Sequence, residues 1–278
     1  MQIRLLSATD IPDGTHCLCS SSVSVAGGNV TGMEIPPLFE IPVSAESWHT
    51  RRRVGFDLET TSRFPSEARI VSAALVVFDP AEGDAPRVRE WLVDPGVEIP
   101  AETTAIHGIS TEYARAEGQQ AAEAIRQIVV ELTKEFEAGS AIVIMNAPYD
   151  LTVLRHEAER YGVGFPEPYP VIDPLVIDKQ VDKYRRGKRR LGDLCGVYGV
   201  LLNEAHSAAP DAQAGVEVAC CLAEKYPQLQ IPAEELHELQ VQWKAEQAAD
   251  FQEFLRRTKP DAVIDPAWPI VPAFVSGA

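Results

Sequence analysis

The sequence predicts an α/β domain in which helices flank a mixed β-sheet. Three segments with strand character follow one another after Arg53, and helical patterns then alternate with short apolar strands. The stretch D-P-A-E-G-D-A-P between the second and third segments is polar and short, so we expect an antiparallel hairpin there. The 278 residues, 45% of them hydrophobic and 24% charged, can bury a sizeable core.

The first half of the domain is expected to supply three strands. Val54 to Leu58 is predicted as the first of them. Ile70 to Phe78 is almost continuously apolar, which is typical of a buried strand. Val88 to Val93 shows the alternation of a strand with one buried face and is predicted as the third.

Helices predominate after the third strand. Residues 120–137 carry Ala, Ile and Leu at three- and four-residue steps, the period of an amphipathic helix, and Gly139 ends it. Asp173 is expected to cap a further helix whose first residue is Pro174. The other expected elements are helices over 150–161, 191–198 and 211–226 and strands over 141–145 and 171–173.

Both ends of the chain lie outside this pattern. Residues 1–45 are rich in Ser, Gly and Pro, and we expect a poorly ordered N-terminal extension. Residues 46–227 make up the predicted α/β domain. Residues 228–278 are expected to hold one long amphipathic helix after Pro232 and a Pro-rich tail that cannot continue it. This helix either packs on its own domain or docks a partner.

Charge and composition exclude some classes of function. A formal net charge of −16 argues against a bulk nucleic-acid binder, although an enzyme that grips only a few phosphates remains compatible with it. Six of the eight residues from Lys183 to Arg190 are basic, which fits either a solvated loop or the phosphate-contacting edge of a groove. We see no membrane-spanning run, no secretory signal and no disulfide framework among five cysteines, and we expect a cytoplasmic protein.

Two acidic residues share the end of the first predicted strand. Asp57 and Glu59 are two residues apart in D-L-E-T-T, so both side chains leave the same face of the sheet. Two carboxylates aimed the same way are costly unless a cation lies between them. The alternative is a solvent-exposed acidic strand end.

Further polar residues stand where strands give way to helices. Asp150 follows a predicted strand, where an N-capping Asp would also stand, and Asn146 at the strand end is a loop-bracing amide or a substrate contact. Pro210 marks the first turn of a helix, which leaves His206 on the preceding loop and Asp211 on the helix. A fixed metal ligand beside a movable base suits attack by water.

Together these side chains are typical of a metal-dependent nuclease. Carboxylates that converge repel one another, and hard oxygen ligands of this kind suit Mg²⁺ or Mn²⁺. A pair of such ions clamps the attacking and leaving oxygens during in-line displacement at phosphorus. A histidine beside the ions can take the proton from the attacking water.

The motifs resemble those of the DEDDh family of 3′→5′ exonucleases, whose members include the proofreading epsilon subunit of bacterial DNA polymerase III. The resemblance covers about residues 50–227 and includes the segment I-H-G-I-S at 106–110. It implies a ribonuclease H-like exonuclease fold with a five-stranded mixed sheet flanked by helices. It also implies that two divalent cations, Mg²⁺ or Mn²⁺, are held by Asp57, Glu59, Asp150 and Asp211, that His206 is the general base, and that Thr60, His107 and Asn146 contact the terminal nucleotide.

Three positions depart from the family pattern. Ser62 stands where Gly usually follows D-x-E-T-T, and Met145 and Tyr149 replace the His and Phe often found around N-x-x-x-D. None of these changes removes an implied ligand, so we expect an active enzyme.

The leading hypothesis is an exonuclease that releases nucleoside 5′-monophosphates from the 3′ ends of single-stranded DNA, with a DNA polymerase or another replication or repair protein as partner. An exoribonuclease acting on short RNA is the alternative within the enzyme class, because no motif reads the 2′-hydroxyl. A catalytically silent, polymerase-associated binding subunit is the alternative outside it.

Overall fold

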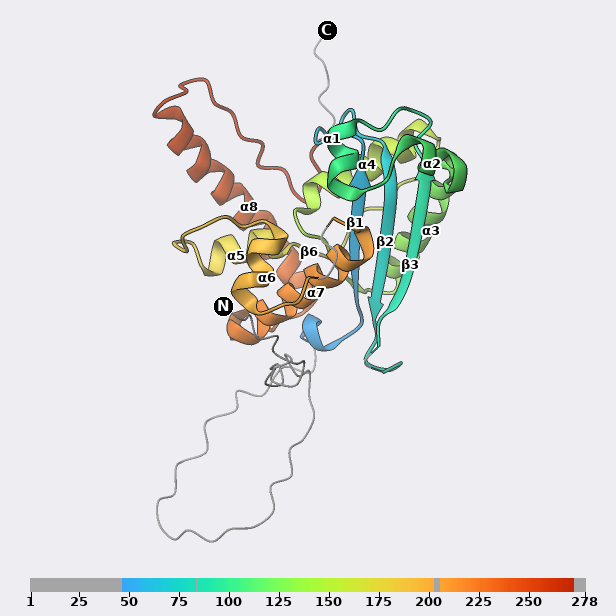
Figure 1. The fold of residues 1–278 in the computed structure, drawn as a ribbon. Helices are drawn as coiled ribbons and strands as arrows, with labels where there is room; N and C mark the ends of the chain where they lie inside the picture. The colour runs from blue at the N-terminus through green and yellow to red at the C-terminus, as the bar shows by residue number, and fades with distance from the viewer. Residues whose placement is uncertain (1–46, 84, 203–205, 273–278) are drawn as a thin grey trace, which may run out of the picture. The chain divides into compact units, whose positions relative to one another are not determined.

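A six-stranded mixed sheet organises the part of the chain that the computed structural model describes, which is residues 47–83, 85–202 and 206–272 (Figure 1). The expected extension over 1–45 lies outside these residues. The strand order is β4-β3-β2-β1-β5-β6; β2 is antiparallel to β1 and to β3, and the other neighbouring pairs are parallel. The sixth strand, beyond the five expected, is the two-residue β4. The strands are β1 Arg53–Thr60, β2 Ile70–Phe78, β3 Arg87–Asp94, β4 Gln119–Gln120, β5 Ala141–Val143 and β6 Val171–Ile172.

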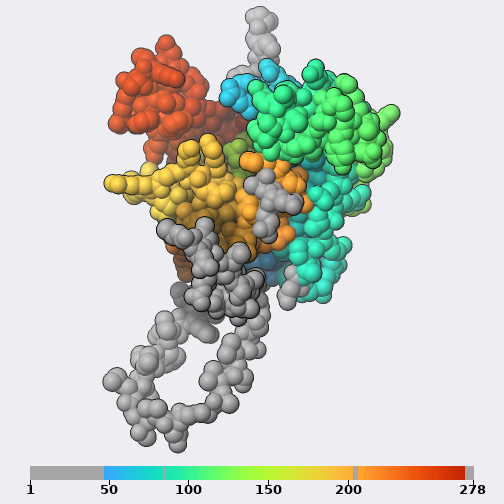
Figure 2. Space-filling view, viewed as in Figure 1, coloured from blue at the N-terminus to red at the C-terminus, as the bar shows by residue number. Residues whose placement is uncertain are grey.

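Helices cover both faces of the sheet. The pair α3 and α4 packs on one face, where apolar residues of β1, β2 and β3 join the larger core cluster. On the other face α7 lies against β1 and β2. Figure 2 views this side, with α7 in orange between the strands in teal and α5 and α6 in yellow. The helices are α1 Ala101–His107, α2 Thr111–Glu117, α3 Ala121–Glu137, α4 Ala147–Arg160, α5 Pro174–Val181, α6 Leu191–Tyr198, α7 Ala208–Lys225 and α8 Ala233–Arg256, with 3₁₀ turns at Trp48–Thr50 and Pro227–Leu229.

The beginning of α4 differs from the sequence prediction. Asn146 occupies the N-cap position in a left-handed conformation (φ 63°), and Pro148 lies in the first turn, where its missing N–H costs nothing. The helix therefore starts three residues earlier than expected, and Asp150 lies inside it rather than capping it. The seven-residue helices α1 and α2 were not expected, since two turns are too short to establish a helical period.

The edge strand β6 is covered by side chains of α8. Val171 N donates to His237 Nδ1 at 3.0 Å, and Gln240 Nε2 donates to Val171 O at 3.0 Å. The amide of Asp173, just beyond the strand, donates to Gln240 Oε1 at 2.6 Å. These bonds replace those of a missing neighbouring strand, so α8 packs on its own domain through its first turns. The proposed domain limits at 45/46 and 227/228 stay predictions.

The outer half of α8 projects away from the sheet (Figure 1). Phe251 and Phe254 stack there with ring centroids 6.5 Å apart, and both are exposed. Within the described residues, no helix combines the length and the apolar character needed to cross a membrane.

Candidate active site

The alternation of β1 aims two carboxylates at α7. Val54, Phe56 and Leu58 are buried in the core formed with α3 and α4. The residues between them face the opposite side, and Asp57 and Glu59 are partly buried there. The shared face expected from the two-residue spacing is therefore observed.

A close approach of α7 to β1 adds a third carboxylate. A Cβ on Gly55 would lie only 2.4 Å from Ala212 O, so the backbones of strand and helix meet at this glycine. Asp211 precedes Ala212 and is carried to the acidic end of β1. One carboxylate oxygen from each of Asp57, Glu59 and Asp211 lies within 4.8 Å of the others.

Asp150 reaches β1 from its open side. The short strand β5 pairs with β1 only as far as Gly55, so the later amides of β1 on this side lack a strand partner. Leu58 N instead donates to Asp150 Oδ1 at 3.1 Å, across 92 residues of sequence. Asp150 is buried beside the other three acids. It does not belong to the group of Asp57, Glu59 and Asp211, whose oxygens lie within 4.8 Å of one another.

Burial and mutual repulsion make ionisation of this cluster costly. Desolvation, followed by the charges of Asp150, Glu59 and Asp211, raises the pKa of Asp57 well above its usual value. Desolvation and the charge of Asp211 raise the pKa of Glu59 to about 7. The pKa values of Asp150 and Asp211 are also raised, mainly by desolvation, although hydrogen bonds from Leu58 N and His206 N oppose the rise.

The donor set fits a hard divalent cation. Asp211 Oδ1 is buried and has no hydrogen-bond partner within the described part of the chain. None of the ion pairs among the described residues involves any of the four carboxylates, so no Lys or Arg neutralises them. Converging carboxylate oxygens without a basic partner are the ligands that Mg²⁺ or Mn²⁺ takes in proteins.

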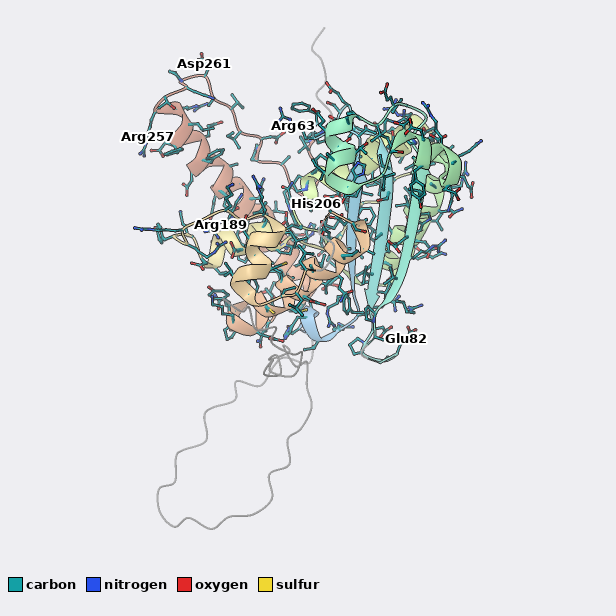
Figure 3. The ribbon with its side chains drawn as sticks, viewed as in Figure 1. Arg63, Glu82, Arg189, His206, Arg257 and Asp261 are labelled. Carbon is teal, nitrogen blue, oxygen red and sulfur yellow. The ribbon has the colours of Figure 1, made fainter. Side chains whose placement is uncertain are left out.

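Two histidines lie beside the acids. His206 is exposed just before α7, with φ 71°, and its backbone N–H donates to Asp211 Oδ2 at 3.2 Å. Figure 3 labels it between α1 and the start of α7. His107 ends α1 and accepts a hydrogen bond from Ile109 N through Nδ1 at 3.2 Å. Burial lowers the pKa of His107, a hydrogen bond with the Thr60 backbone opposes this fall, and the nearby charge of His206 adds to it.

Tyr149 is a site residue whose contacts the sequence did not indicate. Its hydroxyl donates to Ser62 O and also contacts Thr60 Oγ1. Burial raises the pKa of Tyr149 to about 12, so the phenol stays protonated. Ser62 and Tyr149, two of the positions that depart from the family pattern, are thus in contact and hold Thr60 at the end of β1. Asn146 is exposed at the α4 N-cap, and its side chain makes no capping bond.

The basic run Lys183–Arg190 is partly used inside the fold. Arg185 and Arg189 both bind the buried carboxylate of Asp178, and Lys183 pairs with Asp250 of α8 at 2.8 Å. Figure 3 labels Arg189, which lies in the segment that joins α5 to α6. Exposed Arg186 and Lys188 stay outside the ion pairs of the described residues. Several of these bases therefore fix the loop and others face solvent, and contact with phosphate stays a prediction.

Known proteins similar to this chain are nucleases and polymerase subunits. It is 35% identical over 167 residues to a DNA polymerase III subunit epsilon-like protein of Rhodobacter capsulatus, a match that covers 59% of this chain but only 22% of that protein. It is 28% identical over 175 residues to the DNA polymerase III subunit epsilon of Rickettsia conorii, covering 60% and 71% of the two chains. E. coli exonuclease I in complex with a dT13 oligonucleotide matches 64% of this chain and 42% of its own, with a TM-score of 0.54 and 21% identity.

The exonuclease I likeness shows the fold, and the ribonuclease H-like expectation is confirmed. The family model described as exonuclease (RNase_T) matches residues 54–219, which is more than half of the chain and includes all eight candidate site residues. The predicted resemblance is thereby confirmed as well: this chain belongs to the exonuclease family.

Proposed function

We propose that this chain is a divalent-metal-dependent 3′→5′ exonuclease that releases nucleoside 5′-monophosphates from single-stranded DNA. The observation that carries the proposal is the convergence of Asp57, Glu59 and Asp211 within 4.8 Å, with Asp150 bound to the same strand. Exonuclease I, a structural neighbour, is described with a dT13 oligonucleotide, which supports single-stranded DNA as the substrate class.

The family resemblance implies a role for each candidate residue. Asp57, Glu59, Asp150 and Asp211 would hold two divalent cations, which when bound clamp the attacking and leaving oxygens of an in-line displacement. His206 would accept the proton of the attacking water, since this residue is exposed and its backbone N–H binds the carboxylate of Asp211. Thr60, His107 and Asn146 would contact the terminal nucleotide.

Digestion of end-labelled oligonucleotides with Mn²⁺ tests the proposal. The wild-type protein should shorten a 5′-labelled single strand stepwise from its 3′ end. Asp211→Asn should abolish digestion because one ligand is lost, while Asp261→Asn, at an exposed position beyond α8, should leave it unchanged. Undiminished digestion by Asp211→Asn would reject the ligand assignment.

The role of His206 is tested separately. His206→Ala should lower turnover by roughly 10²–10⁴-fold, the usual contribution of a general base, without weakening Mn²⁺ binding measured by calorimetry. A normal rate would reject the assignment of the base. The same assay with matched DNA and RNA strands decides between the proposed substrate and short RNA.

A replicative DNA polymerase is the proposed partner. One similar protein is named DNA polymerase III subunit epsilon, and another is named as similar to that subunit. Affinity purification from the native host tests this. Co-purification with a polymerase, combined with no digestion in either Mg²⁺ or Mn²⁺, would favour the catalytically silent subunit instead.

A further inference from the structure

The carboxylate of Asp173 joins three segments next to the candidate active site. It is buried, and each of its oxygens accepts two hydrogen bonds. Oδ1 accepts from Asn146 N at 3.0 Å and Leu175 N at 2.9 Å. Oδ2 accepts from Ala147 N at 3.1 Å and from Trp268 Nε1 at 3.2 Å. Asp173 therefore ties the first amides of α4 to the start of α5 and to the C-terminal segment.

The first turn of α4 is the element that Asp173 fixes. Its amides at 146 and 147 need acceptors because a helix leaves its first N–H groups unpaired, and the Asn146 side chain supplies no cap. Asp150 lies one turn further on, with Oδ1 held by Leu58 N. A shift of this turn would move Asp150 relative to Asp57 and Glu59.

The segment that follows α8 also contacts α4 at further residues. The Trp268 ring is buried against the ring of His237 in α8, with centroids 4.8 Å apart. Val271 N donates to Thr152 Oγ1 at 3.0 Å, and Arg155 Nη2 donates to Val271 O at 2.7 Å. Figure 1 shows the chain after α8 returning toward α4. These contacts lie within and just after the turn that carries Asp150.

We propose that Trp268 is a positioning residue that acts through Asp173 on α4 and Asp150, so that a segment outside the family-matched residues 54–219 sets the metal affinity of the active site. The inference rests on the proposed role of Asp150 as a ligand. An indole N–H on a buried carboxylate fixes where that carboxylate can accept its other bonds. Outer groups that orient ligands in this way typically contribute 10–100-fold to metal affinity.

Trp268→Phe tests the proposal, with Trp91→Phe as its matched control. Both tryptophans are buried, and Trp91 Nε1 donates to Gln127 Oε1 at 3.1 Å on the β3–α3 side. Each substitution keeps an aromatic ring and removes one indole hydrogen bond. We expect Trp268→Phe to weaken Mn²⁺ binding, measured by calorimetry without substrate, by at least about ten-fold. Trp91→Phe should leave Mn²⁺ affinity unchanged at a similar melting temperature.

Hydrogen exchange supplies a readout that needs neither metal nor activity. The backbone amides of Asn146, Ala147, Tyr149 and Asp150 should exchange faster in Trp268→Phe than in Trp91→Phe. Mn²⁺ affinity and exchange equal to those of the wild type, or equal losses in both variants, would overturn the proposal. Failure of the proposed function would appear in the wild-type protein as absent digestion, whereas failure of this inference appears only in the comparison of the two variants.

Discussion

Replacing Glu59 by Gln should stabilise the metal-free protein at pH 8. Burial and the charge of Asp211 raise the pKa of Glu59 from 4.5 to about 7. A carboxyl group with a higher pKa in the folded state binds its proton more tightly there, so ionising it lowers the free energy of unfolding. The neutral amide of Gln removes this cost.

The size of the effect follows from the pKa. At about 1.4 kcal/mol for each pKa unit, a rise from 4.5 to about 7 corresponds to about 3 kcal/mol. Glu59 is partly exposed and solvent screens its charge, so we expect a gain on the order of 1–3 kcal/mol. The cost is full above pH 7, declines as the pH falls through the folded-state value, and is gone below pH 4.5, where wild type and variant should converge.

Urea unfolding in EDTA, repeated with saturating Mn²⁺, measures the free energy of unfolding of the metal-free protein and its increase when the metal binds. A ligand present at 100 times its Kd stabilises the folded state by about 2.7 kcal/mol. The wild-type protein should gain at least this much from Mn²⁺, and Glu59→Gln should gain less because it lacks one proposed ligand. The stability advantage that Glu59→Gln has in EDTA should therefore shrink when the metal is added.

Glu90→Gln provides the control, since Glu90 is exposed on β3. This substitution should change the free energy of unfolding by no more than about 0.5 kcal/mol. The reasoning is refuted if the wild-type protein is more stable than Glu59→Gln in EDTA at pH 8, because the clustered carboxylates would then not destabilise the metal-free fold.

Three further perturbations address the surroundings of the site. Gly55→Ala places a Cβ 2.4 Å from Ala212 O, so it should cost about 1–3 kcal/mol in urea unfolding and weaken Mn²⁺ binding; an unchanged Mn²⁺ affinity would contradict this. Arg69→Met removes a 2.8 Å partner of the buried Glu157 carboxylate and should lower the free energy of unfolding by about 2 kcal/mol, and no loss would contradict it. Tyr149→Phe removes the hydroxyl contacts at the end of β1 and should raise the KM for oligonucleotides several-fold without changing Mn²⁺ affinity; an equal KM would show that these contacts do not shape the site.

The acidic pair on β1 was predictable because it depends on a local period. Side chains two apart on a strand share a face, and the structure places Asp57 and Glu59 accordingly. Pro210 likewise indicated a helix start, and His206 lies before α7 while Asp211 lies within it. The long helix after Pro232 follows the expected apolar period over 233–256.

Other features depend on contacts between distant segments and leave no local pattern. The start of α4 was misplaced because Asp173, 26 residues further along the chain, accepts from its amide at Ala147. The contact from Trp268 to Asp173 spans 95 residues and could not be read from the Pro-rich tail. Sequence periodicity predicts which face a residue takes, whereas the partners that hold a site in place come from tertiary structure.

The cover that α8 gives to β6 also limits where the chain can be cut. His237 and Gln240 occupy backbone groups that a strand from another molecule could otherwise bind. Ending the protein at residue 227, near the limit of the family match, would leave a bare sheet margin able to recruit a second copy. A protein shortened to residue 227 should therefore self-associate. The part of the chain that folds as a single molecule extends well past the end of the family match at residue 219.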